Sequence, residues 1–213
     1  MKHNSIIVFE GLPFILLSLL LTLCAAFFGF YILASCLALL TLFILSFFRN
    51  PERRFTEESG MIVSPADGRV IKIEEVDLDQ SIRGKYKKIS IFMNVFNVHV
   101  NRAPCEGTIE AIQYHPGKFL SANLDKASAE NERNEILIRT PEGHNVWVVQ
   151  IAGLIARRIV CWITLREGVA KGQRIGLIRF GSRVEVFAPP ESEITVRVGD
   201  KVRAGETKLG YLK

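Results

Sequence analysis

Residues 87–100 read KKISIFMNVFNVHV and carry apolar side chains on both faces of a predicted strand. One face holds Ile89, Ile91, Met93 and Val95, and the other holds Phe92, Phe96, Val98 and Val100. Successive side chains of a strand point to opposite faces, so a strand of this composition is covered on both sides. The stretch therefore predicts a central strand, around which a β domain is built.

Further strands are predicted on both sides of this stretch, throughout residues 61–213. Short runs rich in Val, Ile and Phe are separated by turn pairs such as Asp67-Gly68, Glu106-Gly107 and Gly199-Asp200. We expect strands at 69–76, 87–100, 107–114, 135–140, 145–153, 158–165, 174–180, 183–188, 193–198 and 207–212. Residues 118–134 are more polar and are expected to form a loop with a short helix. The fold class is therefore mainly β.

Three short pieces indicate a particular β architecture. Ser64–Val70 (SPADGRV) resembles Ala103–Ile109 (APCEGTI), and Val198–Glu206 reads VGDKVRAGE. Such pieces resemble the barrel-sandwich domains that carry biotin or lipoate. They open one alternative function, a membrane-anchored biotinyl- or lipoyl-like carrier or adaptor without chemistry of its own. No Met-Lys-Met or Asp-Lys-Ala lies on a hairpin between the pieces, which weakens this alternative.

An uncharged block precedes the β region. From Gly11 to Phe48 the chain has 38 residues and no charged one. As a single helix the block would be about 57 Å long at about 1.5 Å per residue, against about 30 Å for the hydrocarbon core of a bilayer. We therefore expect a transmembrane helical hairpin with spans at 13–28 and 31–48, joined at Gly29. The block is too long for the apolar core of a cleaved signal peptide.

Positive charge flanks this hairpin. Lys2 precedes it, and Arg49, Arg53 and Arg54 follow it, which places both ends on the cytoplasmic face of the cell (inner) membrane. The net charge of +5 resides outside the hairpin and suits an anionic membrane surface. Nucleic acid is not an expected partner, because no basic stripe interleaved with aromatic residues is present. The expected domains are the anchor, 1–48, and a β-rich catalytic domain, 49–213.

The chain lacks the common motifs for metals and nucleotides. Its four Cys include no CxxC, its four His include no pair at i, i+4, and no GxGxxG, GxxxxGK[ST] or GxSxG is present. We therefore expect no metal site, and free thiols in a reducing cytoplasm.

Three local features could carry chemistry, and each also has an ordinary structural explanation. Gly181-Ser182 interrupts an otherwise continuous β run and could be a bulge or a tight bend. Ser64–Gly68 could be a plain β-turn, and His99 a core residue of a buried strand. Together, Asp67, His99 and Ser182 could instead form a relay in which a base, oriented by a carboxylate, activates a hydroxyl.

An ordered set of motifs resembles the phosphatidylserine decarboxylase family in its short bacterial and archaeal form. The set follows the apolar hairpin and comprises FFRNPER (47–53), SPADG (64–68), VHVNRAP (98–104), PGKF (116–119), LDKAS (124–128), NERN (131–134), QIAG (150–153), ARRI (156–159) and RFGS (179–182). Each piece is weak by itself, but the ordered set covers essentially the whole chain.

The resemblance implies an enzyme that makes its own covalent pyruvoyl group. His99, oriented by Asp67, takes the Ser182 proton; the alkoxide attacks the Gly181 carbonyl, and elimination of the resulting ester leaves a pyruvoyl group derived from Ser182. The chain is thereby cut into a large fragment, 1–181, and a small one, 182–213, which form a heterodimer. The ketone forms a Schiff base with phosphatidylserine, carbon dioxide leaves, and His99 protonates the resulting carbon to give phosphatidylethanolamine.

One position departs from the family pattern. Longer relatives carry a second histidine three residues after the first, where this chain has Arg102. His99 then acts as both base and acid, or another group shares the work. Arg102 holds a substrate phosphate or carboxylate, or else forms a structural salt bridge.

Two different enzymes are also compatible with these residues. An archaetidylserine decarboxylase would act on the same headgroup with an ether-lipid backbone, and a hydrolase would use an intact Ser182 in an uncut chain. The lipid backbone, the acyl-chain preference and the oligomeric state are not determined by the sequence.

Overall fold

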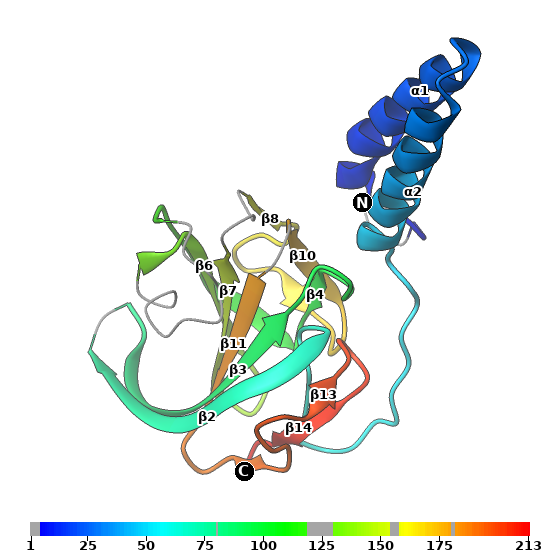
Figure 1. The fold of residues 1–213 in the computed structure, drawn as a ribbon. Coiled ribbons are helices and arrows are strands. Elements are labelled where there is room, and N and C mark those ends of the chain that lie inside the picture. Colours follow the sequence, from blue (N-terminus) through cyan, green and yellow to red (C-terminus); the bar gives the residue numbers. More distant parts are fainter. Residues whose placement is uncertain (1–4, 80, 119–129, 154–157, 180–181) are drawn as a thin grey trace. The chain divides into compact units, whose positions relative to one another are not determined.

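The computed structural model describes residues 5–79, 81–118, 130–153, 158–179 and 182–213. The chain divides into two compact units, Met1–Glu52 and Arg53–Lys213. Figure 1 shows a pair of helices in the first unit and a curled β-sheet structure in the second.

The first unit contains a short 3-10 helix, η1 (Phe9–Gly11), and two apolar helices, α1 (Leu12–Phe27) and α2 (Tyr31–Phe47). Gly29 lies between them with a φ of +79°, a left-handed conformation that glycine adopts readily. The helices pack along each other, and the Thr22 and Thr41 hydroxyl oxygens lie 3.5 Å apart. Within the described residues, Phe9–Phe27 is the one helix long and apolar enough to cross a membrane, whereas Tyr31–Phe47 is shorter.

The second unit is built from antiparallel strands. Their bounds are β1 (Met61–Val63), β2 (Gly68–Asp79), β3 (Arg83–Met93), β4 (Val100–Arg102), β5 (Gly107–His115), β6 (Arg133–Arg139), β7 (Asn145–Ala152), β8 (Ile159–Cys161), β9 (Gly168–Val169), β10 (Arg174–Ile178), β11 (Ser182–Ala188), β12 (Glu193–Ile194), β13 (Lys201–Val202) and β14 (Lys208–Tyr211). Eight strands form one curled sheet in the order β13-β2-β3-β11-β7-β6-β5-β9, and two three-stranded sheets have the orders β1-β14-β12 and β4-β10-β8. The mainly β expectation is confirmed.

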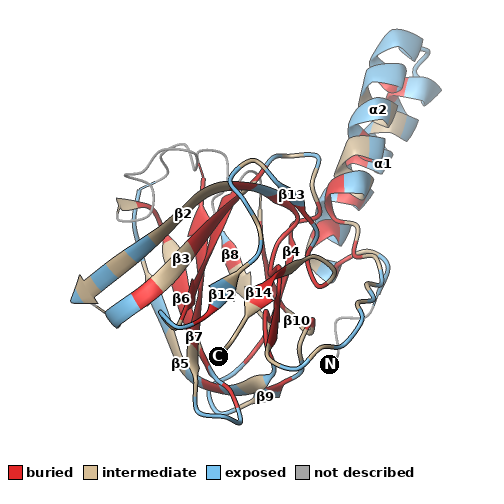
Figure 2. Cartoon of the chain, turned by 90° about the horizontal axis from the view of Figure 1, so that it is seen from below, coloured by how far each residue is buried: buried red, intermediate tan, exposed pale blue. Residues whose placement is uncertain are grey.

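The main core lies between the eight-stranded sheet and the two small sheets. It combines residues such as Ile91, Val148 and Val184 of the large sheet with Ile62 and Ile175 of the small ones, all fully buried. Strand β11 is buried along its whole length, and its neighbour β7 is buried at all but its first residue, which Figure 2 shows in red. A second apolar cluster, which includes Tyr86, Trp147 and Phe187, covers the other face of the large sheet.

The β unit consists of two similar halves related by an approximate two-fold axis. Read from its two edges, the large sheet has the order β13-β2-β3-β11 in one half and β9-β5-β6-β7 in the other. The register of each half is broken by a bulge at the corresponding place, between Val70 and Lys72 and between Ile109 and Ala111. The SPADGRV and APCEGTI pieces occupy equivalent positions, so the repeat seen in the sequence is also a repeat of structure.

Reciprocal hydrogen bonds join the two equivalent turns. Arg102 N donates to Pro65 O and Val63 N donates to Pro104 O, each at 2.9 Å. The VGDKV piece contributes β13, which pairs with β2 directly after the SPADG turn.

The predicted strand 87–100 is wrong in its second half. Strand β3 does lie inside the large sheet, between β2 and β11, but it ends at Met93. Residues 94–97 turn, because the Asn97 side chain accepts from Asn94 N and the Asn94 side chain accepts from Phe96 N, each at 2.9 Å. The chain then enters β4 in a different sheet, and His99 directly precedes that strand.

Shorter elements account for the other differences. The strands predicted at 158–165 and 193–198 are reduced to β8 and β12, and β1, β9 and β13 were not predicted because two or three residues show no periodicity. Of the predicted loop at 118–134, residues 119–129 lie outside the described part of the chain.

Candidate active site

Ser182 is the first residue of β11 and is fully buried. Its backbone is flanked on both sides, because it pairs with Met93 of β3 and with Ala152 of β7. Its side chain shares the core-facing side of β11 with Val184, and its hydroxyl donates to Met93 Sδ at 3.3 Å. Gly181, the other half of the predicted cleavage site, lies outside the described residues.

His99 lies at the same end of the molecule as Ser182. It is 1% exposed, and its backbone carbonyl accepts from Ile178 N at 3.4 Å, four residues before Ser182. Its Nδ1 lies 3.0 Å from the Asn97 carbonyl, which only accepts, so Nδ1 carries the proton. The lone pair is then on Nε2, the nitrogen that can act as a base.

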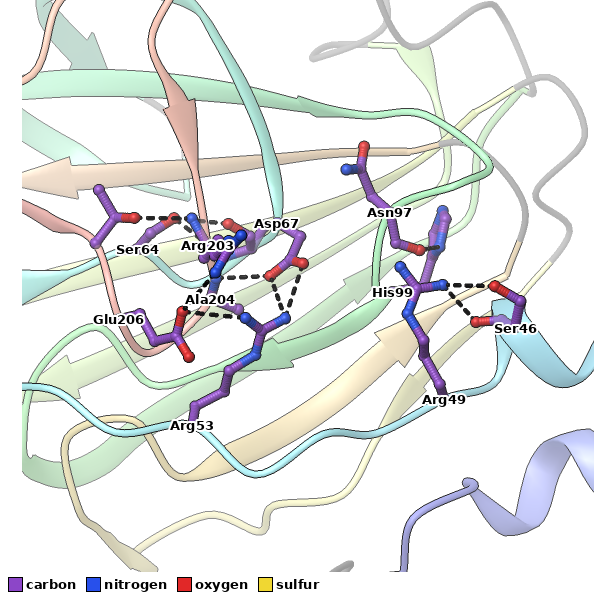
Figure 3. A network of polar contacts seen from close by, with 12 residues as sticks. Ser46, Arg49, Arg53, Ser64, Asp67, Asn97, His99, Arg203, Ala204 and Glu206 are labelled. Atoms are coloured by element: carbon purple, nitrogen blue, oxygen red, sulfur yellow. Dashed lines mark hydrogen bonds and ion pairs between the residues drawn. The ribbon is translucent and has the colours of Figure 1, made fainter.

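Asp67 ends the SPADG turn and directly precedes β2. Its carboxylate pairs with Arg53, with Oδ2 2.9 Å from Nη2, and its Oδ1 accepts from Ala204 N at 2.8 Å. Arg53 in turn binds Glu206 at 3.1 Å, and Figure 3 shows the Asp67 carboxylate directed into this group. In this conformation Asp67 and His99 Nδ1 have different partners, and the orientation of His99 by Asp67 stays a prediction.

Arg102 is the last residue of β4 and directly precedes the APCEGTI piece. It is 6% exposed, and its Nη1 donates to the Gly172 carbonyl at 2.9 Å. A Cβ added at Gly205 would lie 2.8 Å from Arg102 Cδ, so the glycine leaves room for this side chain. This contact ties Arg102 to the loop before β10, and the binding of a substrate phosphate or carboxylate by Arg102 stays a prediction.

Sequence reasoning missed a line of buried polar side chains that leads to Ser182. Asn134 Nδ2 donates to Gln150 Oε1 at 3.0 Å, and Gln150 Nε2 donates to Asn101 Oδ1 at 2.9 Å. Asn101 Nδ2 then lies 3.7 Å from Met93 Sδ, the sulfur that also accepts from Ser182. The available signal was that Asn101, Asn134 and Gln150 all lie in the ordered motifs, VHVNRAP, NERN and QIAG.

The opposite face of the large sheet carries an ionic network. Arg183 and Glu185 are both buried, with Nε and Oε1 3.5 Å apart, and Ser90 donates to Glu185 at 3.1 Å. Burial tends to raise the pKa of Glu135, but hydrogen bonds from Ser81 and Arg133 outweigh it and lower that pKa. A pocket of about 520 Å³ is lined in part by Glu135 and Glu185. Because side chains alternate along β11, this network lies on the face away from the Ser182 side chain.

The cysteines are free thiols. Burial raises the pKa of Cys105 to about 12, and burial also raises the pKa of Cys161. Among the residues that the structure describes, no three His, Cys, Asp or Glu side chains gather in a way that would hold a metal ion.

A buried serine and a buried histidine at one end of a β fold belong here to a carboxy-lyase, since the family model described as phosphatidylserine decarboxylase matches residues 40–210. That match covers most of the sequence, so the chain belongs to the phosphatidylserine decarboxylase family.

Individual relatives match over nearly their full length. A phosphatidylserine decarboxylase proenzyme of Syntrophus aciditrophicus is 56% identical, with 99% of each chain covered. Proenzymes with the same name from Desulfotalea psychrophila and Nitrosomonas eutropha are each 50% identical, over 95% and 99% of this chain and 95% and 97% of theirs.

Proposed function

We propose that this chain is a proenzyme that cleaves itself between Gly181 and Ser182 and then decarboxylates phosphatidylserine to phosphatidylethanolamine, with release of carbon dioxide. The observation that carries the proposal is the position of Ser182, buried as the first residue of β11, at the end of the molecule where His99 is also buried. The names of the relatives, each a decarboxylase proenzyme, support both parts of it.

Self-cleavage uses groups of the chain and one water molecule. His99 Nε2 takes the proton of the Ser182 hydroxyl, and Oγ attacks the Gly181 carbonyl carbon. The peptide C–N bond breaks, the Ser182 nitrogen is protonated, and an ester joins Gly181 to Oγ. Loss of the Ser182 α-proton then breaks the Cβ–Oγ bond and releases Gly181 as a carboxylate. Water replaces the remaining nitrogen, which leaves as ammonia, and residue 182 ends as a pyruvoyl group.

The surroundings of Ser182 fit such a group. Pairing with Met93 and Ala152 holds the backbone of residue 182 after its link to residue 181 is broken. When present, the pyruvoyl group supplies the electron sink for loss of carbon dioxide. His99 is the group proposed to deliver a proton to the product carbon, and Asp67 the group proposed to orient it.

The two fragments are proposed to stay together as a heterodimer. Residues 182–213 contribute β11, which lies between β3 and β7, as well as β13 and β14, which pair with β2 and β1. Arg53 and Asp67 of the large fragment bind Glu206 and Ala204 of the small one. Separating the fragments would therefore expose a central strand of the sheet.

The helices of the first unit are proposed to anchor the enzyme in the membrane as a hairpin, with residues 49–213 on the cytoplasmic face. The outward faces of the two helices expose residues such as Leu20, Ile32 and Leu42, which suits a lipid environment. A tethered enzyme needs only to reach the headgroup of a lipid at the surface of the same membrane. A diacyl lipid fits the bacterial relatives, whereas an archaeal ether lipid and a barrel-sandwich carrier are weaker candidates.

Intact mass under denaturing conditions tests the proposal. The wild-type chain should give two fragments, the smaller weighing roughly 3.6 kDa in proportion to the 24.0 kDa chain and lighter by one ammonia than a peptide that starts with serine. Both fragments of the wild-type chain should stay in the membrane pellet after extraction with alkaline carbonate. A single uncut wild-type chain, or a small fragment that starts with ordinary serine, would contradict the proposal.

The His99→Ala variant should remain uncut, because no base would take the Ser182 proton. His144→Ala is a matched control, because His144 directly precedes β7, whereas Ser182 pairs with Ala152 at the other end of that strand. It should process like the wild type.

A further inference from the structure

The buried amides near Ser182 occur in only one half of the two-fold repeat. The pairs Ile91–Val184 and Ile138–Val146 are equivalent in the two halves. Four residues further along, Asn134 pairs with Gln150 in one half, and Lys87 pairs with Ala188 in the other. Gln150 and Ala188 are both 0% exposed, so the same buried position carries an amide in one half of the large sheet and a methyl group in the other.

The same asymmetry holds for Asn101. It pairs with Gly176, and its counterpart Ile62 pairs with Gly210. These two glycines are equivalent, since a Cβ added to either would lie 2.2 Å or 2.0 Å from a carbonyl oxygen of the neighbouring strand. Asn101 and Ile62 are both 0% exposed.

The difference between the two halves indicates that the strands can form without the buried amides. A buried amide costs free energy unless each of its polar atoms is paired, and an apolar core needs no such pairing. The half that contains Ile62 and Ala188 forms the same strands without amides, so the fold itself does not require them. The amides are joined to one another and, through Met93 Sδ, to the Ser182 hydroxyl.

We propose that Asn134, Gln150, Asn101 and Met93 are positioning residues for self-cleavage. This inference rests on the proposed function. Methionine has three rotatable side-chain bonds and is normally adaptable, but the Asn101 amide, itself held by Gln150, fixes the thioether. The fixed sulfur sets the rotamer of Ser182 and so the starting point of Oγ for attack on the Gly181 carbonyl. A thioether cannot take the proton, which therefore stays with the hydroxyl until His99 removes it.

Met93→Leu tests the role of the sulfur, because it removes the acceptor and nearly conserves the volume. We expect self-cleavage to slow at least tenfold, as measured by intact mass over time after synthesis in a cell-free system with membranes. The pH midpoint of cleavage should stay at the wild-type value, because the titrating base is unchanged. Hydroxylamine should release no extra fragment, because the defect precedes formation of the ester. Thr140→Val, at the position equivalent to Met93, should cleave at the wild-type rate.

A second variant keeps the proposal falsifiable if Met93→Leu folds poorly. Asn101→Leu combined with Gln150→Met and Asn134→Leu removes the three linked amides together, so that none stays buried and unpaired, and should slow cleavage by a similar factor. Melting temperatures, compared in a Ser182→Ala background so that all chains are uncut, should stay close to that of the parent.

Two outcomes would overturn the proposal. One is cleavage of both variants at the wild-type rate. The other is a loss of cleavage that follows a matching loss of melting temperature, which would make the amides merely structural. Neither outcome bears on the proposed function, which is tested separately by the intact mass of the wild-type chain.

Discussion

At the scale of single residues, the chemistry depends on how protons are distributed between a few side chains. In this conformation the Asn97 carbonyl accepts from His99 Nδ1, the contact that the relay hypothesis gave to the Asp67 carboxylate. Asp67 is instead engaged by Arg53 and by Ala204 N. Its influence on His99 is therefore open to a direct test.

Two substitutions at Asp67 separate orientation from stability. Asp67→Ala leaves Ala204 N and Arg53 without this acceptor. Because the side chains of Arg53 and Asp67 are each only 10% exposed, we expect a loss of about 3–5 kcal/mol in the free energy of unfolding. Asp67→Asn keeps an acceptor for Ala204 and should cost less. Urea denaturation in the Ser182→Ala background measures both. If Asp67→Asn also processes at the wild-type rate, Asp67 does not orient His99.

At the scale of elements, two asparagines decide where a strand ends. Hydropathy predicted one strand over 87–100, but the Asn94 and Asn97 side chains bond to the backbone of the turn and divide it. The turn sends the chain from the large sheet into β4 and so brings His99 next to the end of β10. Propensity summed over apolar residues misses such a turn, because its signal lies in two short polar side chains.

Close strand packing leaves no room for a side chain at specific glycines. In Gly210→Ala the new Cβ would lie 2.0 Å from the Glu193 carbonyl oxygen, and we expect a loss of about 1–3 kcal/mol, with about 2–4 °C of melting temperature for each kcal/mol. Gly168→Ala is the matched control, since its Cβ would meet nothing within 4 Å. Equal melting temperatures for the two variants, measured by calorimetry, would contradict the packing seen between β12 and β14.

At the scale of the whole molecule, the chain must stay assembled after it has been cut. The proposed small fragment supplies part of every sheet except the one formed by β4, β10 and β8. A half-buried polar cluster reinforces this assembly, because Lys208 and Tyr211 of the small fragment both bind the Glu58 carboxylate of the large one.

This group predicts a pH dependence. Hydrogen bonds from Tyr211 and then from Lys208 lower the pKa of Glu58. A lowered pKa in the folded state contributes stability above the ordinary value of about 4.3, and that contribution is lost as the pH falls through the lower folded value. Glu58→Gln should therefore unfold in urea with a weaker dependence on pH between about pH 3 and pH 5. An unchanged acid limb would show that the contact does not join the fragments in solution.

The sequence by itself determined the β class, the apolar helices, the family and the residues Asp67, His99 and Ser182 as candidates. Each of these is a local property, since periodicity, charge and motif order are all read along the chain. Only the tertiary structure decided that Asp67 binds Arg53, that two distant repeats form equivalent halves, and that Asn134, Gln150 and Asn101 lead to Ser182. These features join residues from different strands, and pairing between distant strands is set by the packing of the whole sheet rather than by neighbours in the chain.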